Sequence, residues 1–157
     1  MTAFDETPEH GWRVHRLLEC RAAAQPDFPF LHFDGQDYSH AEINRRANRM
    51  AEGLIARGLE PGMRVAVMMK SAPEYIDVWF ALAKAGAVEV PLNTAYKGDL
   101  LEHILKSSDS SALVVEEDWL TKGQPSFSNG TFSNNKRPRF IRLDSDCSIA
   151  SRTEIFQ

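Results

Sequence analysis

Apolar residues in the first third of the chain recur with the period of an α-helix. Their 3.6-residue spacing over 39–57 predicts a helix with one face in the core, and a weaker pattern predicts another over 11–24. Ser39 followed by Glu42 has the spacing in which side chains satisfy the free amides of a helix N-terminus, and Gly58 marks the helix end. The predicted core face of the 39–57 helix comprises Ile43, Ala47, Met50, Ala51, Leu54 and Ile55.

Between the two helices, apolar residues flank the turn-forming pair Asp34-Gly35. Phe30 to Phe33 precede this turn and Tyr38 follows it, which predicts a short β-hairpin.

After residue 60, apolar strands alternate with helices. Three continuous apolar runs predict strands that are buried on both faces. Ser71 and Glu74 repeat the capping spacing before the helix that follows the first of these strands, and that helix is expected to stop at Gly86. Strand, helix, strand, helix, strand in this order predicts an α/β fold with a parallel sheet flanked by helices. The predicted strands are 64–69, 87–92 and 112–115, and the second crossover helix is 99–106.

The alternating pattern ends after Trp119. Residues 121–138 are dominated by Ser, Asn, Gly, Thr and Pro, so they are expected to be a polar loop or linker, or a disordered segment. Within 139–157, residues 140–143 suit one more strand and the rest is a tail without an assignment. The interpretation is therefore a partial domain over 8–120, followed by the polar loop and the tail.

Composition and charge narrow the class of protein. At 157 residues with 43% hydrophobic and 25% charged residues, the chain is long enough for one globular domain with its own core. The net charge of −4 is uneven, because residues 1–120 hold 12 Lys and Arg against 19 Asp and Glu. Residues 121–157 hold 6 against 3, densest at Lys136-Arg137-Pro138-Arg139. We interpret this basic stretch as a solvated face and expect no nucleic-acid partner.

Targeting and redox signals are weak. The longest apolar stretch, Val78 to Leu92, is interrupted by charged residues and is shorter than the roughly 20 residues of a membrane span. The first ten residues are acidic and lack an apolar segment, so no secretory signal is expected and the cytoplasm is the predicted location. Cys20 and Cys147 lie far apart without partners at ligand spacing, so no metal site is predicted.

Candidate chemistry belongs at the carboxyl ends of the strands, where open parallel sheets bind ligands. The turns there lack the closely spaced glycines of a phosphate loop, and Ser71 is interpreted as a helix cap in preference to an anion site. Glu116-Glu117-Asp118 is expected to point in different directions and meet solvent. No histidine is expected in a triad or a metal site with Ser, Cys or a carboxylate; the five are His10, His15, His32, His40 and His103.

Several motifs resemble one enzyme family. LAKAGAVEVPLN at 82–93 resembles a core motif of the adenylate-forming (AMP-binding) superfamily, which includes acyl-CoA synthetases, luciferases and peptide-synthetase adenylation domains. YSHAEIN at 38–44 resembles that family's early "TYxEL" segment, and PGMRVA at 61–66 resembles its "GDxVA" strand entry. Segments 72–75, 79–81 and 91–94 are most similar to the acyl-CoA synthetase and acid-CoA ligase branch, including its fatty-acid ligase-like members.

The resemblance covers about residues 8–120 and implies an incomplete subdomain of the adenylate-forming N-terminal domain. Family members adenylate a carboxylic acid with ATP and magnesium, then pass the acyl group to CoA. The resemblance places the phosphate loop and the catalytic lysine beyond this chain. Residues 128–136 look like the family loop "SGTTGxPKG", but Asn129 and Ser133 replace two glycines, so side chains would obstruct a triphosphate.

The sequence therefore predicts a fragment of an ATP-dependent carboxylic acid–CoA ligase that is inactive by itself. The alternative is a standalone, non-catalytic α/β interaction module. No catalytic residue or metal ligand is assigned, and ATP, magnesium and CoA are implied only for a complete enzyme. Asn93, Thr94 and Tyr96 are the candidates for substrate or coenzyme contact, although Asn93 and Thr94 also suit side chains that satisfy turn amides. An uncovered sheet edge is expected to promote self-association.

Overall fold

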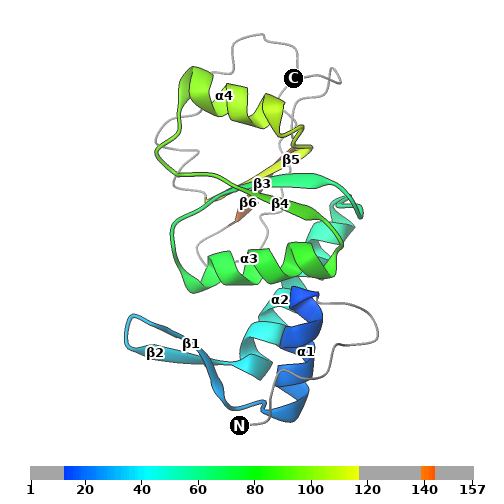
Figure 1. Cartoon of the computed structure of the whole chain (residues 1–157), viewed down its shortest axis with the longest axis vertical. Coiled ribbons are helices and arrows are strands. Elements are labelled where there is room, and N and C mark those ends of the chain that lie inside the picture. Colours follow the sequence, from blue (N-terminus) through cyan, green and yellow to red (C-terminus); the bar gives the residue numbers. More distant parts are fainter. Residues whose placement is uncertain (1–12, 117–138, 144–157) are drawn as a thin grey trace.

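The computed structural model describes residues 13–116 and 139–143 (Figure 1). These residues form an α/β fold in which a parallel sheet is flanked by helices, as the alternation of strands and helices predicts. In chain order the elements are α1 (Val14–Ala24), β1 (Pro29–Phe33), β2 (Gln36–Ser39), α2 (His40–Ala56), β3 (Arg64–Met68), α3 (Pro73–Lys84), β4 (Val88–Pro91), α4 (Gly98–Ser107), β5 (Ala112–Glu116) and β6 (Arg139–Leu143).

The strands form two separate sheets. β1 and β2 pair as the predicted antiparallel hairpin, with positive φ at Asp34 and Gly35 in its turn. The larger sheet has the order β4-β3-β5-β6, and every neighbouring pair in it is parallel. The strand expected over 140–143 is β6, which lies beside β5 and extends the sheet. After β3, the chain forms β4 on one side of β3. It then passes back across β3 and forms β5 on the other side.

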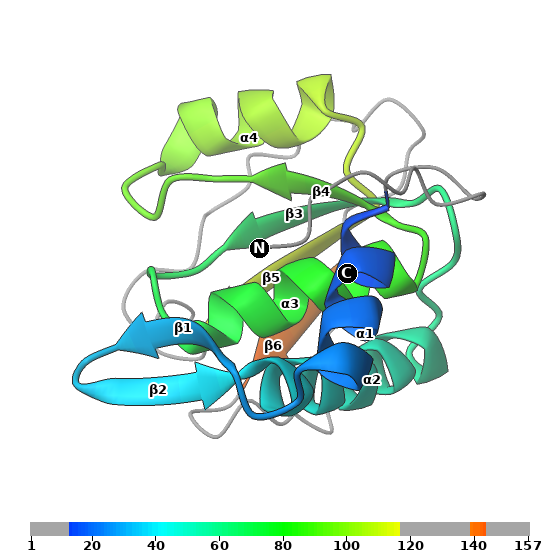
Figure 2. The same ribbon diagram turned by 60° about the horizontal axis from the view of Figure 1, so that its bottom comes forward.

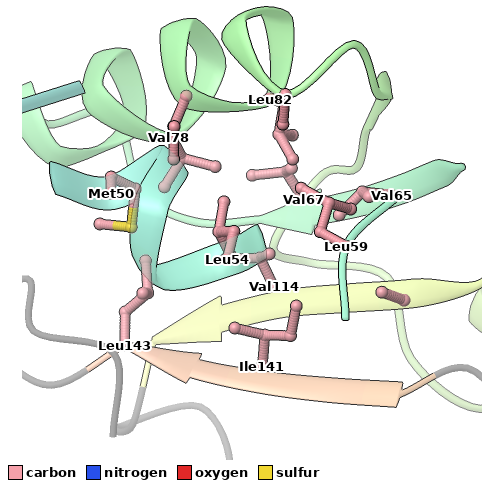
Figure 3. Close-up of a cluster of buried hydrophobic side chains, with 14 of the residues drawn as sticks. Met50, Leu54, Leu59, Val65, Val67, Val78, Leu82, Val114, Ile141 and Leu143 are labelled. Carbon is pink, nitrogen blue, oxygen red and sulfur yellow. The ribbon is translucent and has the colours of Figure 1, made fainter. Parts of the chain in front are cut away.

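Alternation along the central strands gives the sheet two apolar faces. Val65 and Val67 of β3 point to the side covered by α2 and α3, where they pack with Leu54 and Leu82 (Figure 3). Ala66 and Met68 point to the opposite side, which α4 covers (Figure 1). Burial on both faces explains why β3 and β5 are continuous apolar runs in the sequence.

The α2 helix begins as its sequence predicts but buries a narrower face. The Ser39 hydroxyl accepts a hydrogen bond from the Glu42 amide at 3.3 Å, which confirms the cap. Five of the six predicted core residues are buried, whereas Ile55 is 53% exposed, so that prediction was wrong. Successive side chains of an α-helix differ in direction by about 100°, so Ile55 points away from the buried face on which Leu54 lies.

Two other local predictions were wrong. The α3 helix begins at Pro73 after an Ala72 N-cap, and no side chain caps it, so Ser71 lies outside the helix. Proline is favoured at the first helical position because it has no amide hydrogen to satisfy, and here it sets the start. β4 is an edge strand with Val88 half exposed, although its sequence suggested burial on both faces.

Candidate functional site

The sheet has a topological switch point between β3 and β5. Helices α3 and α4 cover opposite faces of the sheet (Figures 1 and 2). In chain order β3 is followed by β4 and β5 by β6, and these two following strands lie on opposite sides of the neighbouring pair β3 and β5. Ligands of open parallel sheets bind at such a point. Here Lys70 follows β3 and Glu116 ends β5.

Lys70 and Glu116 are joined across this switch point. The Lys70 backbone N–H donates to Glu116 Oε1 at 3.0 Å, and Lys70 Nζ lies 3.3 Å from Glu116 Oε2. The Lys70 side chain is 70% exposed and the Glu116 side chain 26%. The carboxyl edge therefore already holds one carboxylate, bound by a backbone amide and an ammonium group.

This pair was missing from the sequence-based interpretation. Glu116 was expected to meet solvent with Glu117 and Asp118, but its carboxylate bonds to Lys70; the other two acids lie outside the described residues. The sequence holds part of the signal, because Lys70 and Glu116 each stand at the end of an apolar run. The pairing of the two strands, which brings these residues together, comes from the structure.

The three predicted contact residues share the loop after β4. Asn93 Oδ1 accepts a hydrogen bond from the Ala95 amide at 2.9 Å, so the Asn93 side chain satisfies a turn amide. Thr94 is exposed, and Tyr96 is half-buried against the apolar cluster under α4. Within the described part of the chain, no hydrogen bond joins these residues to Lys70 or Glu116.

A second charged cluster is buried between α2 and α3. Arg46 Nε donates to Asp77 Oδ2 at 2.8 Å, and its other nitrogens reach Glu74 at 3.3 Å and Glu42 at 4.0 Å. The guanidinium also lies over the ring of Tyr38, 5.3 Å from the ring centre. This one cation therefore connects the hairpin, α2 and α3.

Asp77 is the most unusual carboxylate in this cluster. It is 2% exposed, and its Oδ1 is buried without a hydrogen-bond partner. Burial raises the pKa of Asp77 to about 6, although the Arg46 guanidinium opposes the shift. Such shifts are common at functional sites. In this case the contacts of the cluster all lie between packed elements, so its role is to hold α2 against α3.

One histidine of the described residues is paired with a carboxylate. His32 Nδ1 lies 2.6 Å from Asp37 Oδ1, a pair of exposed residues that the hairpin register places opposite each other and that the sequence did not suggest. Among residues 13–116 and 139–143, no three His, Cys, Asp or Glu side chains gather to hold a metal ion. The helices in the same residues are too short or too polar to cross a membrane.

Comparison with known proteins assigns this fold to a family. The family model described as "AMP-binding enzyme" matches residues 18–151, which is most of the chain. The chain belongs to the AMP-binding enzyme family. The match runs past residue 120, where the resemblance in the motifs ends, and includes β6.

Two branches of AMP-binding relatives are equally similar to the chain. Medium/long-chain-fatty-acid–CoA ligase FadD6 of Mycobacterium tuberculosis is 33% identical over 118 residues, covering 75% of this chain and 20% of FadD6. Phosphinothricin tripeptide synthetase PhsC of Streptomyces viridochromogenes is 33% identical over 111 residues, covering 71% of this chain and 10% of PhsC. The superfamily is thus established, and the chain spans a fifth or less of the length of these relatives.

A solved structure shares the fold of the described residues. The N-terminal subdomain of NpsA from Klebsiella oxytoca, in complex with anthranilyl-AMSN, superposes with a TM-score of 0.71 at 21% identity. The superposition covers 99% of this chain and 37% of the NpsA chain. The described α/β unit therefore has the fold of this N-terminal subdomain and spans 37% of the NpsA chain.

Proposed function

We propose that this chain supplies the first part of the N-terminal domain of an ATP-dependent carboxylic acid–CoA ligase. The observation that carries the proposal is the AMP-binding match over residues 18–151 on a parallel α/β sheet. The similarity to FadD6 over 75% of the chain fits the CoA-ligase branch, and segments 72–75, 79–81 and 91–94, which resemble that branch, are the reason for preferring it over the equally similar peptide-synthetase branch. A complete enzyme of this kind activates a carboxylic acid with ATP and magnesium and transfers the acyl group to CoA.

The chain by itself is proposed to be inactive. An enzyme that transfers a nucleotidyl group must neutralise the negative charge that develops on the phosphates. At the described strand ends, the Lys70 ammonium is already paired with the Glu116 carboxylate, and that carboxylate repels phosphate. The loop-like residues 128–136 lie outside the described residues, and their sequence lacks two of the glycines that backbone approach requires.

Pyrophosphate exchange tests this proposal directly. The purified chain, given ATP, magnesium and a panel of fatty acids, aromatic acids and amino acids, is expected to show no acid-dependent exchange of labelled pyrophosphate into ATP. FadD6 with a fatty acid is the positive control. Exchange above a no-protein blank that requires one of the acids would contradict the proposed inactivity.

The branch is decided by the reading frame after Gln157. A continuation that carries a phosphate loop and supports acyl-CoA formation from a fatty acid would support the CoA-ligase proposal. Acid activation without transfer to CoA would favour the peptide-synthetase branch represented by PhsC. A stop codon directly after Gln157 would favour the standalone interaction module. The cytoplasmic location, the lack of a nucleic-acid partner and self-association through the sheet edge stay predictions.

Asn93, Thr94 and Tyr96 are the proposed contacts to substrate or coenzyme in such a complete ligase. Substituting Asn93 and Tyr96 by Ala in that enzyme is expected to raise the KM for the acid or for CoA more than it lowers the melting temperature. Lys97→Ala serves as the comparison, because Lys97 follows the same loop, is exposed and makes no side-chain cap hydrogen bond. A fall in melting temperature with unchanged kinetics would make the residues structural, in line with the Asn93 turn bond.

A further inference from the structure

A groove of about 490 Å³ lies between α1 and α2. The two helices pack against each other, and the chain just after α1 lies at the start of α2, where the Ala41 amide donates to the Pro26 carbonyl at 3.0 Å (Figures 1 and 2). Alanines line part of the groove, namely Ala22 and Ala23 of α1 and Ala41 of α2. Because methyl groups project little, a chain segment can approach the two helix backbones closely along this line.

The α2 side of the groove carries two arginines that form no salt bridge with any described residue. Arg45 and Arg49 are one helical turn apart, both line the groove and both are exposed. Within the described part of the chain, neither guanidinium has a carboxylate within 4.0 Å or any hydrogen bond. Asn48, between them in sequence, also lines the groove and its amide is equally free to donate. Most other arginines of these helices are paired, Arg46 and Arg16 among them.

The acid on the α1 side is already neutralised. Glu19 Oε1 accepts a hydrogen bond from the buried Lys84 ammonium at 2.7 Å, and Glu19 Oε2 accepts one from Arg16 at 3.1 Å. Lys84 also donates to Asn44 Oδ1 at 2.9 Å, which fixes the Asn44 side chain in the groove wall. The lining holds two arginines and two glutamates, and because Glu19 is paired with Lys84 and Arg16, the groups left for a partner are Arg45 and Arg49 against Glu52.

We propose that residues 1–12 of this same chain dock in the α1–α2 groove. This segment contains Asp5, Glu6 and Glu9 and has no Lys or Arg, so its charge is complementary to Arg45 and Arg49. Docking of this segment is independent of the proposed ligase function, because it concerns the outer helices and no ligand of the carboxyl edge.

The length of the segment suits the groove. The segment leads directly into α1, one wall of the groove. The α2 wall from Ala41 to Glu52 is roughly 16 Å long at the rise of an α-helix. Twelve residues reach up to about 40 Å when extended, so the segment can turn back and lie along the whole wall. Paired guanidinium and carboxylate groups at the rim then predict an interaction that weakens with salt.

Charge reversal and its rescue test the proposal on the full chain. Amide hydrogen exchange of residues 1–12 is measured by quench-flow for the natural chain, for Arg45→Glu/Arg49→Glu, for Asp5→Lys/Glu6→Lys/Glu9→Lys, and for the two sets combined. We expect exchange in the natural chain at least tenfold slower than in a free peptide of residues 1–12. Each reversal alone is expected to remove that protection, and the combination to restore at least half of it on a logarithmic scale.

Two controls keep the result interpretable. Lys97→Glu reverses a charge next to α4, on the other side of the sheet, and is expected to leave exchange of residues 1–12 unchanged. Arg45→Gln/Arg49→Gln removes the charges without new repulsion and is expected to lose most of the protection while the melting temperature holds.

Three outcomes overturn the proposal. The first is exchange of residues 1–12 at the rate of the free peptide in the natural chain. The second is protection that neither reversal changes. The third is protection that disappears on dilution, because it would mean that the segment docks on a second copy.

Discussion

Two ion clusters on the same chain have similar distances and opposite surroundings. Arg46 lies 2.7 Å from Asp77 between α2 and α3, where Asp77 is 2% exposed. Lys70 lies 3.3 Å from Glu116 at the carboxyl edge of the sheet, with the lysine largely in solvent. Both pairs join elements that are distant in sequence, since Arg46 precedes Asp77 by 31 residues and Lys70 precedes Glu116 by 46.

The difference lies in the cost of breaking each pair. A buried carboxylate that loses its cation cannot recover its hydration, so the loss is large. An exposed pair returns to water when it breaks, so the loss is small and another partner can replace either group. The Arg46 cluster is therefore part of the scaffold, whereas Lys70 and Glu116 can separate at little cost.

Removing the cation of the buried cluster is expected to have the largest effect. Arg46→Ala leaves Asp77 buried without its partner and deletes the contacts to Glu74 and Tyr38, so the free energy of unfolding should fall by about 3 kcal/mol or more. Urea unfolding followed by circular dichroism measures this. Arg45→Ala is the matched control, because Arg45 is the neighbouring arginine of α2 but is exposed, and it should change stability by less than about 0.5 kcal/mol. Equal losses in the two variants would contradict the scaffold role.

The protonation of Asp77 sharpens the same comparison. Burial raises the pKa of Asp77 from 3.8 to about 6, so the folded state binds a proton that the unfolded state releases between these values. Above about pH 6 Asp77 is ionised in both states, and its burial then lowers the free energy of unfolding by the full amount. As the pH falls from 6 towards 4, the folded state takes up the proton and the free energy of unfolding rises again. The size is roughly 3 kcal/mol at 1.36 kcal/mol for each unit of pKa.

The measurement is a difference between two proteins. Unfolding free energies of the natural chain and of Asp77→Asn are compared at pH 4, 5, 6 and 7, so that the other carboxylates cancel. The natural chain should gain stability relative to the variant on acidification. A constant difference across this range would mean that Asp77 titrates at its ordinary pKa.

Local rules in the sequence predicted the elements of this fold well. The 3.6-residue spacing and the Ser39 cap gave α2, and the apolar runs gave β3 and β5, because both signals depend on neighbours along the chain. Helix α3 was expected too, but Pro73 overrides the Ser71 spacing at its start.

Contacts between distant elements could not be predicted in the same way. Val88 is exposed because β4 is an edge strand. The order of the strands decides this position, and the sequence of β4 contains no information about it. The pairing of Arg46 with Asp77 depends on how α2 packs on α3, and neither helix pattern contains that information. The Lys70–Glu116 pair needed the order β3-β5, which requires the crossovers to be placed first.

The exposed pair at the carboxyl edge should give the smallest effect. Lys70→Met removes the ammonium group. Glu116→Gln removes the negative charge but keeps an oxygen that can accept from the Lys70 amide. The double variant completes a double-mutant cycle. The coupling free energy should lie at about 0.2 to 1 kcal/mol and shrink towards zero in 1 M salt, because solvent screens an exposed pair. Urea unfolding of the four proteins at two salt concentrations measures it. A coupling as large as the Arg46→Ala loss, or one that salt leaves unchanged, would place Lys70 and Glu116 with the scaffold.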